Sequence, residues 1–438
     1  MENICCKSWR GKLAKNKILK PETQYIQTNS NINYALIIKC IFINLCILMS
    51  VYIVYALCTG HSIIPEPTAL LRYDANHYCS IKNIGYTFND QYGSSVAFFP
   101  GFPYLWKLSG LGIRQISILN LFIFLSGFMF LCRHFARNSK DILLFLSLPV
   151  IFFMYVPYSE AIFFVPSVFL LIGLSKRINW LIMLSLFLCS LCRSAANIFV
   201  PAIIITEIIA FENPSALKNI ILYSLSALAG IFIVVVLQHA DTGQWLGFMT
   251  TQKHWEVGLR WPNLPFHTWG NMDDLDGATF LSGIFCCCIL AAMFFRCLKS
   301  KIKVPDKSFV FALLFVGGLT IFTIAFKGGF MFSLGRYIIP TAFFFVVFVN
   351  LIWQKEFTLR QIGLITLCIF AFWLLLGSFV HIRILLGYAF LTLYLSLYLL
   401  INNKSSMIRN IVFYLLYAVN IFLQIHLFFK FLDNKWVG

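Results

Sequence analysis

The sequence predicts an all-α polytopic membrane protein, and three observations lead to that fold class. Of the 438 residues, 60% are hydrophobic and 12% are charged, whereas a soluble domain carries roughly 25% charged residues. The apolar residues form runs of about 20 that extend almost from end to end, and a helix of that length crosses a bilayer. Basic residues stand between the runs. We expect about 11–13 transmembrane helices and no separate globular domain.

The first element is a basic segment, residues 1–35, which we expect to stay in the cytoplasm. Positive residues are retained on that side of a membrane protein. The segment shows no apolar core followed by a small-residue cleavage site, so we predict no removable signal peptide. A first span is expected at roughly 36–57 and would also serve as the targeting signal.

Counting onward from this span places the later basic connections on the cytoplasmic side, in agreement with the positive-inside rule. These connections are 133–140, 176–177, Lys218, 296–307, 355–360 and 404–409. The net charge of +17 is distributed over them rather than gathered in one basic stripe with interleaved aromatics. The sequence therefore predicts no nucleic-acid partner.

The opposite, non-cytoplasmic side receives two long segments, 58–112 and 239–277, and bends near 155–160, Arg193 and 327–336. We expect the first long segment to carry short interfacial helices. Each of these regions contains a charged residue, although a charge at the edge of hydrocarbon costs about 2.5–3.5 kcal/mol. Several such charges on one face indicate a functional site.

Asp74 is the candidate base of this face, because a carboxylate within reach of a hydroxyl can accept its proton. It lies in the segment 72–78 (Arg-Tyr-Asp-Ala-Asn-His-Tyr), before an aromatic segment at 97–103 (Ala-Phe-Phe-Pro-Gly-Phe-Pro). The alternative is a structural one, in which Asp74 pairs with Arg72 to hold the loop. The residues alone leave both possibilities open.

Short elements in this chain resemble the PIG-V family of mannosyltransferases. Residues 72–75 and 97–103 resemble the Arg-Trp-Asp-Ala and Ala-Phe-Phe-Pro-x-Phe-Pro elements of its first luminal loop. Residues 158–161 (Tyr-Ser-Glu-Ala) match a further element, and Arg193-Ser194 with Asn197 resembles an Arg-Ser-Asn element. The departures are Tyr73 in place of the usual tryptophan and the spacer before Asn197.

Two more elements are similar to those of bacterial relatives. Residues 252–255 (Gln-Lys-His-Trp) resemble a Gln-Lys-x-Trp element, and residues 333–337 (Ser-Leu-Gly-Arg-Tyr) resemble an Arg-Tyr element before a late span. The matches keep the family's order along the chain. Residues 36–345 would then form the catalytic transmembrane module, and residues 346–438 would add C-terminal transmembrane helices.

The resemblance implies a GT-C type glycosyltransferase. Such an enzyme transfers a hexose, mannose in characterised members, from a polyprenyl-phosphate carrier to a glycolipid or glycan acceptor on the non-cytoplasmic face. Its partners would be that donor, that acceptor and the surrounding lipids, and it would need no cofactor. Asp74 would activate the acceptor hydroxyl. Displacement in line with the phosphate leaving group would invert the anomeric centre.

The departing phosphate needs positive charge, and the outer face offers five basic residues. These are Arg193, Lys253, His254, Lys327 and Arg336. We favour Arg336, with Lys253 and His254 as a second pair. Arg336 could instead be a snorkelling anchor of a span at 337–353, and the other two could lie in a solvated loop.

Four further residues are expected to support this chemistry. Glu160 would orient Arg193. The other three supporting residues are Arg72, His77 and Trp255.

The sequence signals no metal site. The acidic residues Asp273, Asp274 and Asp276 have no His or Glu partner at a ligand spacing, and we interpret them as a solvated turn.

Cys58 and Cys79 could both face the outer compartment and pair. The aromatic spans near 361–380, 384–401 and 410–430 are expected to face lipid, with His381 and Arg383 as the only charged bend on the outer side.

A transporter or flippase of lipid-linked sugars, without catalysis, is the competing class, because it would share the composition and the basic inner loops. The sequence contains no internal repeat of the kind such carriers show. The segment from Thr242 to Trp255 is more similar to the bacterial branch of the family. It favours a bacterial inner membrane with a periplasmic active face, and the endoplasmic reticulum membrane is the alternative.

Overall fold

The computed structural model describes residues 32–89, 94–209, 215–255, 257–266, 273–298, 306–352, 356–377 and 382–437. These parts of the chain are helical and contain no strand, only an isolated bridge between Phe357 and Asn403. Among them, seven helices are long and apolar enough to cross a membrane, or eight if one bent pair counts as a span. The predicted multi-pass helical architecture is confirmed at this level.

The described spans do not reach the expected 11–13, because several apolar segments are short or broken. Four apolar helices have only 10–17 residues. The segment after residue 139 is divided into α7 (Ser139–Ser147), η2 (Pro149–Tyr155) and α8 (Glu160–Lys176), with a bend of 101° between the last two. Pro149 opens η2 and has no backbone N–H to continue α7.

The first span, α2 (Tyr34–Thr59), agrees with the expected one at 36–57. Asn33 caps its start by accepting a hydrogen bond from the Leu36 N–H at 2.8 Å. Gly60 ends it in the left-handed conformation, with φ of 72°.

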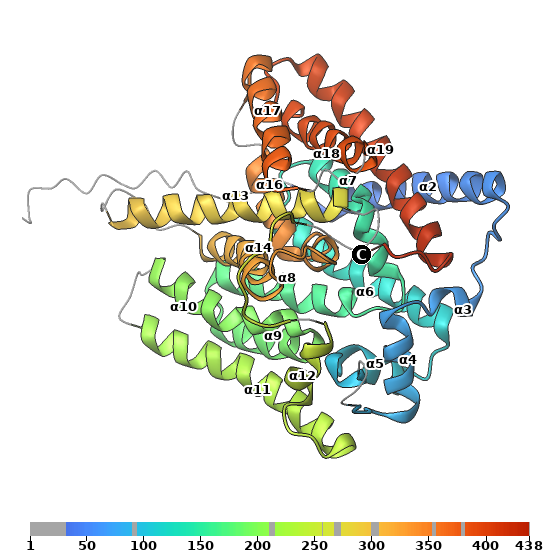
Figure 1. Cartoon of the computed structure of the whole chain (residues 1–438), viewed down its shortest axis with the longest axis vertical. Coiled ribbons are helices and arrows are strands. Elements are labelled where there is room, and N and C mark those ends of the chain that lie inside the picture. The colour runs from blue at the N-terminus through green and yellow to red at the C-terminus, as the bar shows by residue number, and fades with distance from the viewer. Residues whose placement is uncertain are drawn as a thin grey trace, which may run out of the picture.

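The long segment that follows contains four short helices. They are α3 (Pro67–Leu70), α4 (Asp74–Ile84), η1 (Ser95–Ala97) and α5 (Gly101–Ser109), before the second span α6 (Ile113–Phe135). This segment lies below α2 and beside α6 in Figure 1.

The remaining helices follow in chain order. They are α9 (Asn179–Cys192), η3 (Ser194–Ile198), α10 (Phe199–Ile209), α11 (Ala216–Thr242), α12 (Gly247–Thr250), η4 (Thr251–Trp255), α13 (Asp273–Leu298), α14 (Lys307–Phe326), α15 (Leu334–Ile338), α16 (Ala342–Ile352), α17 (Leu359–Leu376), α18 (Ile382–Leu400) and α19 (Ser406–Leu432).

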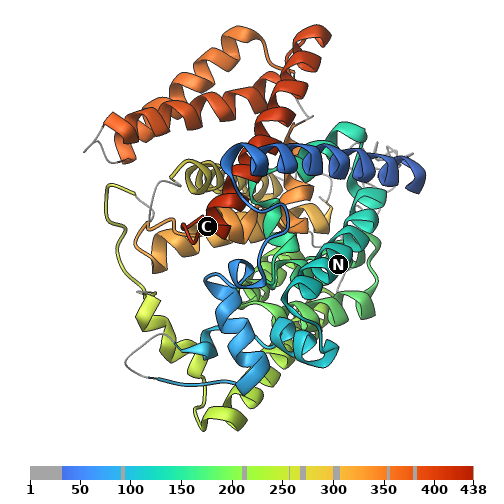
Figure 2. The ribbon, with the colours of Figure 1, turned by 90° about the vertical axis from the view of Figure 1, so that its right-hand side faces the viewer.

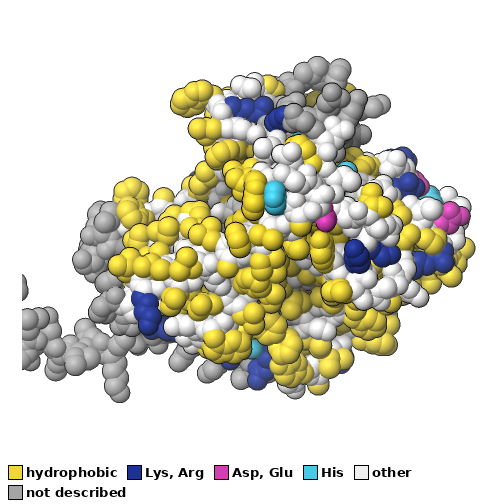
Figure 3. Space-filling view, turned by 90° about the horizontal axis from the view of Figure 1, so that it is seen from below, with side chains coloured by type: hydrophobic (Ala, Val, Ile, Leu, Met, Phe, Trp, Pro, Cys, Tyr) yellow, Lys and Arg dark blue, Asp and Glu magenta, His cyan; other side chains and the backbone are white. Residues whose placement is uncertain are grey.

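The core of the molecule is built around α8, which packs against α6, α9, α14 and α16. Its long run of buried side chains explains why it shows no amphipathic pattern, as expected of a helix surrounded by others. The pair α17 and α18 lies at the upper edge of the molecule in Figures 1 and 2, where α18 packs against α13 and α19. Apolar side chains cover much of the face in Figure 3. A bilayer would cover such a surface.

Candidate functional site

Four charged side chains from distant parts of the chain meet in one group, which we call the ion-pair cluster. Arg336 Nη2 lies 2.5 Å from Asp74 Oδ2, and Arg336 Nε lies 2.6 Å from Glu160 Oε1. Arg193 Nη1 lies 3.2 Å from the same Glu160 oxygen. The cluster thus contains two carboxylates and two guanidinium groups. The structure therefore brings together four of the residues that the sequence singled out.

Most of this cluster is inaccessible, and Asp74 is its open end. The exposed fraction of the side chain is 0% for Glu160, 2% for Arg336 and 7% for Arg193, against 20% for Asp74. Buried charges are tolerated only when they are paired. A small molecule that approaches the cluster therefore meets the Asp74 carboxylate first.

The local sequence places three of these four charges at a helix end. Asp74 and Glu160 are the first residues of α4 and α8, where the positive end of the helix dipole favours a carboxylate. Arg193 directly follows α9, and Arg336 belongs to the short helix α15. The alternative of a snorkelling anchor does not fit Arg336, because its side chain is buried instead of reaching an interface.

Two residues with positive φ precede the central ion pair. Tyr73, just before Asp74, has φ of 49°, and Ser333, at the start of α15, has φ of 61°. Residues with a Cβ rarely adopt this conformation, and where it occurs the surrounding structure must enforce it. Both segments that present the Asp74–Arg336 pair therefore carry backbone strain.

Aromatic rings surround the guanidinium of Arg336. Its Cζ lies 4.4 Å from the centre of the Tyr158 ring and 5.1 Å from that of Phe153. Tyr337 is shared by three cations, since Arg193, Arg336 and Lys327 lie 5.1, 5.7 and 5.6 Å from its ring. A ring face attracts cations, and this tyrosine holds three of them at one place.

The electrostatic environment keeps Arg336 charged. Burial alone would lower the pKa of its guanidinium, but the carboxylates of Asp74 and Glu160 outweigh that effect and raise the pKa well above its usual value. Arg336 is thus a permanent cation whose charge is balanced by the two acids beside it.

Lys327 adds a cation of a different kind. Burial of its amino group lowers its pKa to about 8, although Asp276 partly opposes the shift. Lys327 Nζ also donates a hydrogen bond to the carbonyl of Phe332 at 3.1 Å. Unlike Arg336, this side chain is partly exposed, and it can lose its charge in a mildly alkaline solution.

Asp276 corrects the interpretation of the acidic residues 273–276. Its side chain is only 4% exposed, and its Oδ1 accepts a hydrogen bond from the Gly335 N–H at 2.7 Å. It therefore supports the start of α15 next to Arg336, and a solvated turn is wrong for this residue. The contact crosses 59 positions of the chain. The side chains of Asp273 and Asp274 lie outside the described residues.

Arg72 does not pair with Asp74, so the Arg72–Asp74 pair that the alternative for that aspartate assumed is wrong. Arg72 Nη2 and Nε instead donate to the carbonyl of Leu432, at 3.0 and 3.3 Å, at the end of α19. The Tyr158 hydroxyl donates to the carbonyl of Arg72 at 3.0 Å. Arg72 thus attaches the first loop to the last helix. Asp74 pairs with Arg336 instead.

The C-terminal segment also contacts the first loop, through the ring of Trp436. The ring of Trp436 lies 4.7 Å from that of Tyr73 and 4.8 Å from that of Phe332. It therefore joins the segment that begins α4 to the segment that begins α15.

His77 and its neighbours hold α4 against the rest of the site. The His77 ring stacks on Phe98 at 4.6 Å, and burial lowers its pKa, although Asp74 acts in the opposite direction. One residue further, the Tyr78 hydroxyl donates to Ser159 Oγ at 2.9 Å. His77 thus links residues 72–78 to the aromatic segment at 97–103.

The expected second pair of cations is not part of the ion-pair cluster. Lys253 is exposed, whereas His254 is half-buried and its Nε2 has no hydrogen-bond partner among the described residues. Both belong to η4, which packs against α12 and η1. The side chain of Trp255 lies outside the described residues.

Several other expectations concern residues near the surface. Cys58 and Cys79 are both free thiols, so the expected pairing is wrong. His381 and the side chain of Arg383 fall outside the parts that the structure describes. Within those parts no three His, Cys, Asp or Glu residues are grouped as metal ligands would be.

No protein-family model, curated protein or solved structure matches the chain.

Proposed function

We propose that this protein is a membrane glycosyltransferase of the GT-C type that uses a polyprenyl-phosphate-linked hexose, mannose being the first candidate. The acceptor would be a lipid-linked or glycan hydroxyl on the non-cytoplasmic face. The observation that carries the proposal is the cluster itself, in which the partly exposed Asp74 carboxylate stands against a permanently charged, buried Arg336. A base and a phosphate-binding cation are the two groups that this transfer requires.

In the proposed step, the acceptor oxygen attacks the anomeric carbon while the bond from that carbon to the phosphate oxygen breaks. The bonding electrons leave with the polyprenyl phosphate, and the proton of the acceptor hydroxyl passes to the Asp74 carboxylate. A general base of this kind contributes roughly 10²–10⁴-fold to the rate. Attack from the side opposite the leaving group inverts the anomeric centre.

The donor phosphate would bind between Arg336 and Lys327, which lie around the same Tyr337 ring. A guanidinium has five N–H donors, and the contacts to Asp74 and Glu160 use one N–H on each of two nitrogens. A phosphate that takes over the donor facing Asp74 would release that carboxylate for the acceptor proton. Lys327 replaces the Lys253–His254 pair in this proposal.

The position of the cluster favours an enzyme over a carrier. Transporters bind their cargo near the middle of the membrane. Glu160 lies at the break between η2 and α8, so the contrast is made by the other charges, which lie at the ends of whole helices. Here Glu160 begins α8 and Arg193 follows the end of α9, and Lys327 follows the end of α14. The charges thus gather at one end of three helices, where a lipid-linked sugar and a second substrate can both approach.

The test is transfer by the purified full-length protein in detergent. With radiolabelled polyprenyl-phosphate-mannose and a glycolipid acceptor, we expect labelled product and free polyprenyl phosphate. Asp74→Asn should abolish product while the protein remains folded by size exclusion and thermal unfolding. Asp433→Asn is the matched control, since this acid is exposed and pairs with His61, and it should retain activity. Full turnover by Asp74→Asn, or donor movement across vesicles without bond cleavage, contradicts the proposal.

A further inference from the structure

Residues 257–266, between η4 and α13, expose large apolar side chains. The exposed fraction is 80% for Leu259, 90% for Trp261 and 60% for Leu264. Arg260 is the only charged residue of this segment. Single exposed apolar residues are normal on a protein surface, but a group of them marks a contact with another protein or with a membrane. The segment therefore needs a partner.

The backbone of the segment is bonded to the end of α14. The Gly258 N–H donates to the carbonyl of Phe326 at 2.9 Å. The Arg260 N–H donates to the carbonyl of Ala325, also at 2.9 Å. Both carbonyls belong to the last turn of α14, where a helix leaves its C=O groups without partners of its own. The segment therefore lies at the same depth in the molecule as the end of α14.

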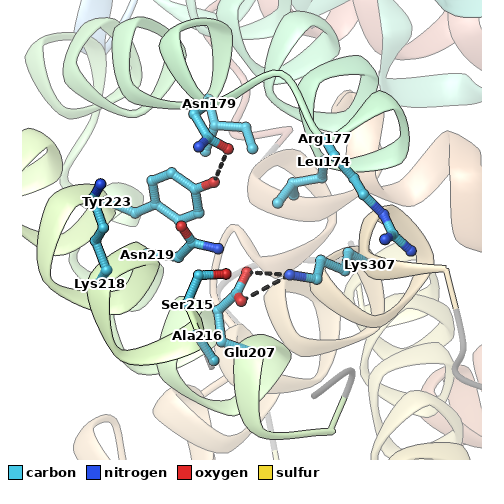
Figure 4. A pocket seen from close by; sticks show the side chains of 11 residues that line it. Leu174, Arg177, Asn179, Glu207, Ser215, Ala216, Lys218, Asn219, Tyr223 and Lys307 are labelled. Atoms are coloured by element: carbon cyan, nitrogen blue, oxygen red, sulfur yellow. Dashed lines mark hydrogen bonds and ion pairs between the residues drawn. The ribbon is translucent and has the colours of Figure 1, made fainter. Parts of the chain in front are cut away.

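This depth corresponds to the surface of the bilayer. The 20 residues of α14 cover about 30 Å, the thickness of a bilayer core. Its first residue, Lys307, lines a cavity together with Arg177 and Lys218 (Figure 4). The positive-inside rule assigns these basic connections to the cytoplasm. The opposite end, at Phe326, then belongs to the outer surface, and so does the segment bonded to it.

The segment also lies at the edge of the molecule. Figure 2 faces the side that carries α3 and α4, and the yellow-green stretch that follows η4 runs along the left-hand outline. On α14, Ile321 and Phe326 are exposed as well. Acyl chains cover an apolar helix surface of this kind. Lipid therefore reaches the end of α14 at the point where the segment is attached.

The same segment holds the chain around Lys327. The Asn263 N–H donates to the carbonyl of Gly328 at 2.9 Å, and Arg260 Nη2 donates to that of Lys327 at 3.2 Å. The Arg260 guanidinium thus turns toward the body of the protein, whereas the neighbouring Trp261 is exposed. A partner that fixes the position of the segment therefore also fixes the depth of Lys327.

We propose that residues 257–266 form a membrane anchor in the outer leaflet, with Leu259, Trp261 and Leu264 among the upper parts of the phospholipid acyl chains. Tryptophan favours this level of a bilayer, because its ring is apolar and its N–H can remain hydrated. The partner is the bilayer and not a soluble protein, because the segment is bonded to the end of a span at the edge of the molecule. The anchor does not depend on the proposed transfer reaction.

The test is photo-cross-linking of the full-length protein in phosphatidylcholine vesicles. Trp261 is replaced by the photoreactive amino acid benzoylphenylalanine, which keeps an aromatic side chain at an exposed position. After irradiation we expect the intact mass to rise by one phosphatidylcholine molecule. The control carries the same replacement at the exposed Lys435, in the C-terminal segment. The C-terminus lies well inside the outline of the molecule in Figure 2, so no lipid adduct is expected there.

Tryptophan fluorescence provides a second measurement. The emission of Trp261 is the difference between the parent chain and Trp261→Phe. We expect brominated phosphatidylcholine to quench this emission and iodide in the water to leave it unchanged. Cross-links between two protein chains in place of lipid adducts would make a second copy the partner and overturn the proposal. Equal lipid adducts at positions 261 and 435, or quenching by iodide alone, would also contradict it.

Discussion

At the scale of single residues, the burial of Arg336 makes it a structural as well as a chemical centre. Replacing it with Gln leaves the fully buried Glu160 with Arg193 as its remaining charged partner. Breaking a buried ion pair by removing one partner costs about 3–5 kcal/mol. We therefore expect Arg336→Gln to lower the unfolding temperature in detergent markedly.

The matched comparison is Arg409→Gln, which removes an arginine from an exposed pair with Glu356. Exposed pairs contribute about 0–1 kcal/mol, so this variant should unfold almost like the parent. A double variant with Glu160→Gln should lose less stability than the sum of the two single losses, because it removes both members of the Arg336–Glu160 pair together. Equal unfolding temperatures for the two arginine variants would contradict the buried pairing.

The lowered pKa of Lys327 predicts a pH dependence of donor binding. With a pKa of about 8, the amine is charged below that pH and loses its proton above it. At pH 9 about a tenth of the molecules keep the charge, so the KM for the donor should rise about tenfold. The donor is a phosphodiester and does not titrate in this range.

The Lys327→Arg variant tests this assignment, since a guanidinium keeps its charge throughout. We expect its KM to stay level between pH 7 and about 9. Lys435→Arg, at an exposed lysine of the C-terminal segment, should retain the rise of the parent chain. The rise would have to be attributed to another group if Lys327→Arg showed it unchanged.

At the scale of elements, close packing between α5 and α9 positions Arg193. A Cβ on Gly101 would lie 2.9 Å from Cys192 Sγ and 3.0 Å from Cys192 Cα and the Leu191 carbonyl. Two of these atoms belong to the backbone, so α9 would have to shift just before Arg193. Overpacking of this kind costs typically about 1–3 kcal/mol.

Gly101→Ala should therefore lower both the unfolding temperature and the transfer activity. Gly363→Ala, in α17, is the control, because no atom lies within 4 Å of the added Cβ. Alanine there should stabilise the helix by up to about 1 kcal/mol. Unchanged stability and activity of Gly101→Ala would show that α5 does not position the end of α9.

The sequence predicts those elements whose cause is local. The first span, the short helices of residues 58–112 and the bend before Glu160 follow from apolar runs and prolines. The meeting of Asp74 with Arg336 was also expected, through the common side of their loops. The partners of Arg72 and Asp276 could not be predicted, because they depend on backbone groups at Leu432 and Gly335 that carry no sequence signal.

The break between α7 and η2 and the short α16 show a related limit. Apolar composition predicts that a segment is buried, but not whether it crosses the membrane as one helix. Length and bends are decided by packing against neighbours, here α8 and α14 for the 11-residue α16. The expected span at 337–353 therefore becomes two shorter helices, α15 and α16.

At the scale of the whole molecule, the two ends of α14 must face opposite compartments if that helix crosses the bilayer. A reagent that cannot cross the membrane should then reach only one of them. Asn76, exposed on α4, marks the end with the ion-pair cluster, and the exposed Lys218, which lines the same cavity as Lys307 at the start of α14, marks the other.

Cysteine substitutions at these two positions would show which compartment each one faces. The variants are treated with a charged maleimide in sealed, right-side-out vesicles. We expect labelling of Asn76→Cys above the parent level and labelling of Lys218→Cys only after the membrane is permeabilised. Inverted vesicles should give the reverse pattern, which controls for local reactivity. Simultaneous labelling of both positions in sealed vesicles would place the ion-pair cluster and Lys218 on the same face. The positive-inside assignment of Lys218 to the cytoplasm and the assignment of the cluster to the outer side could not then both hold.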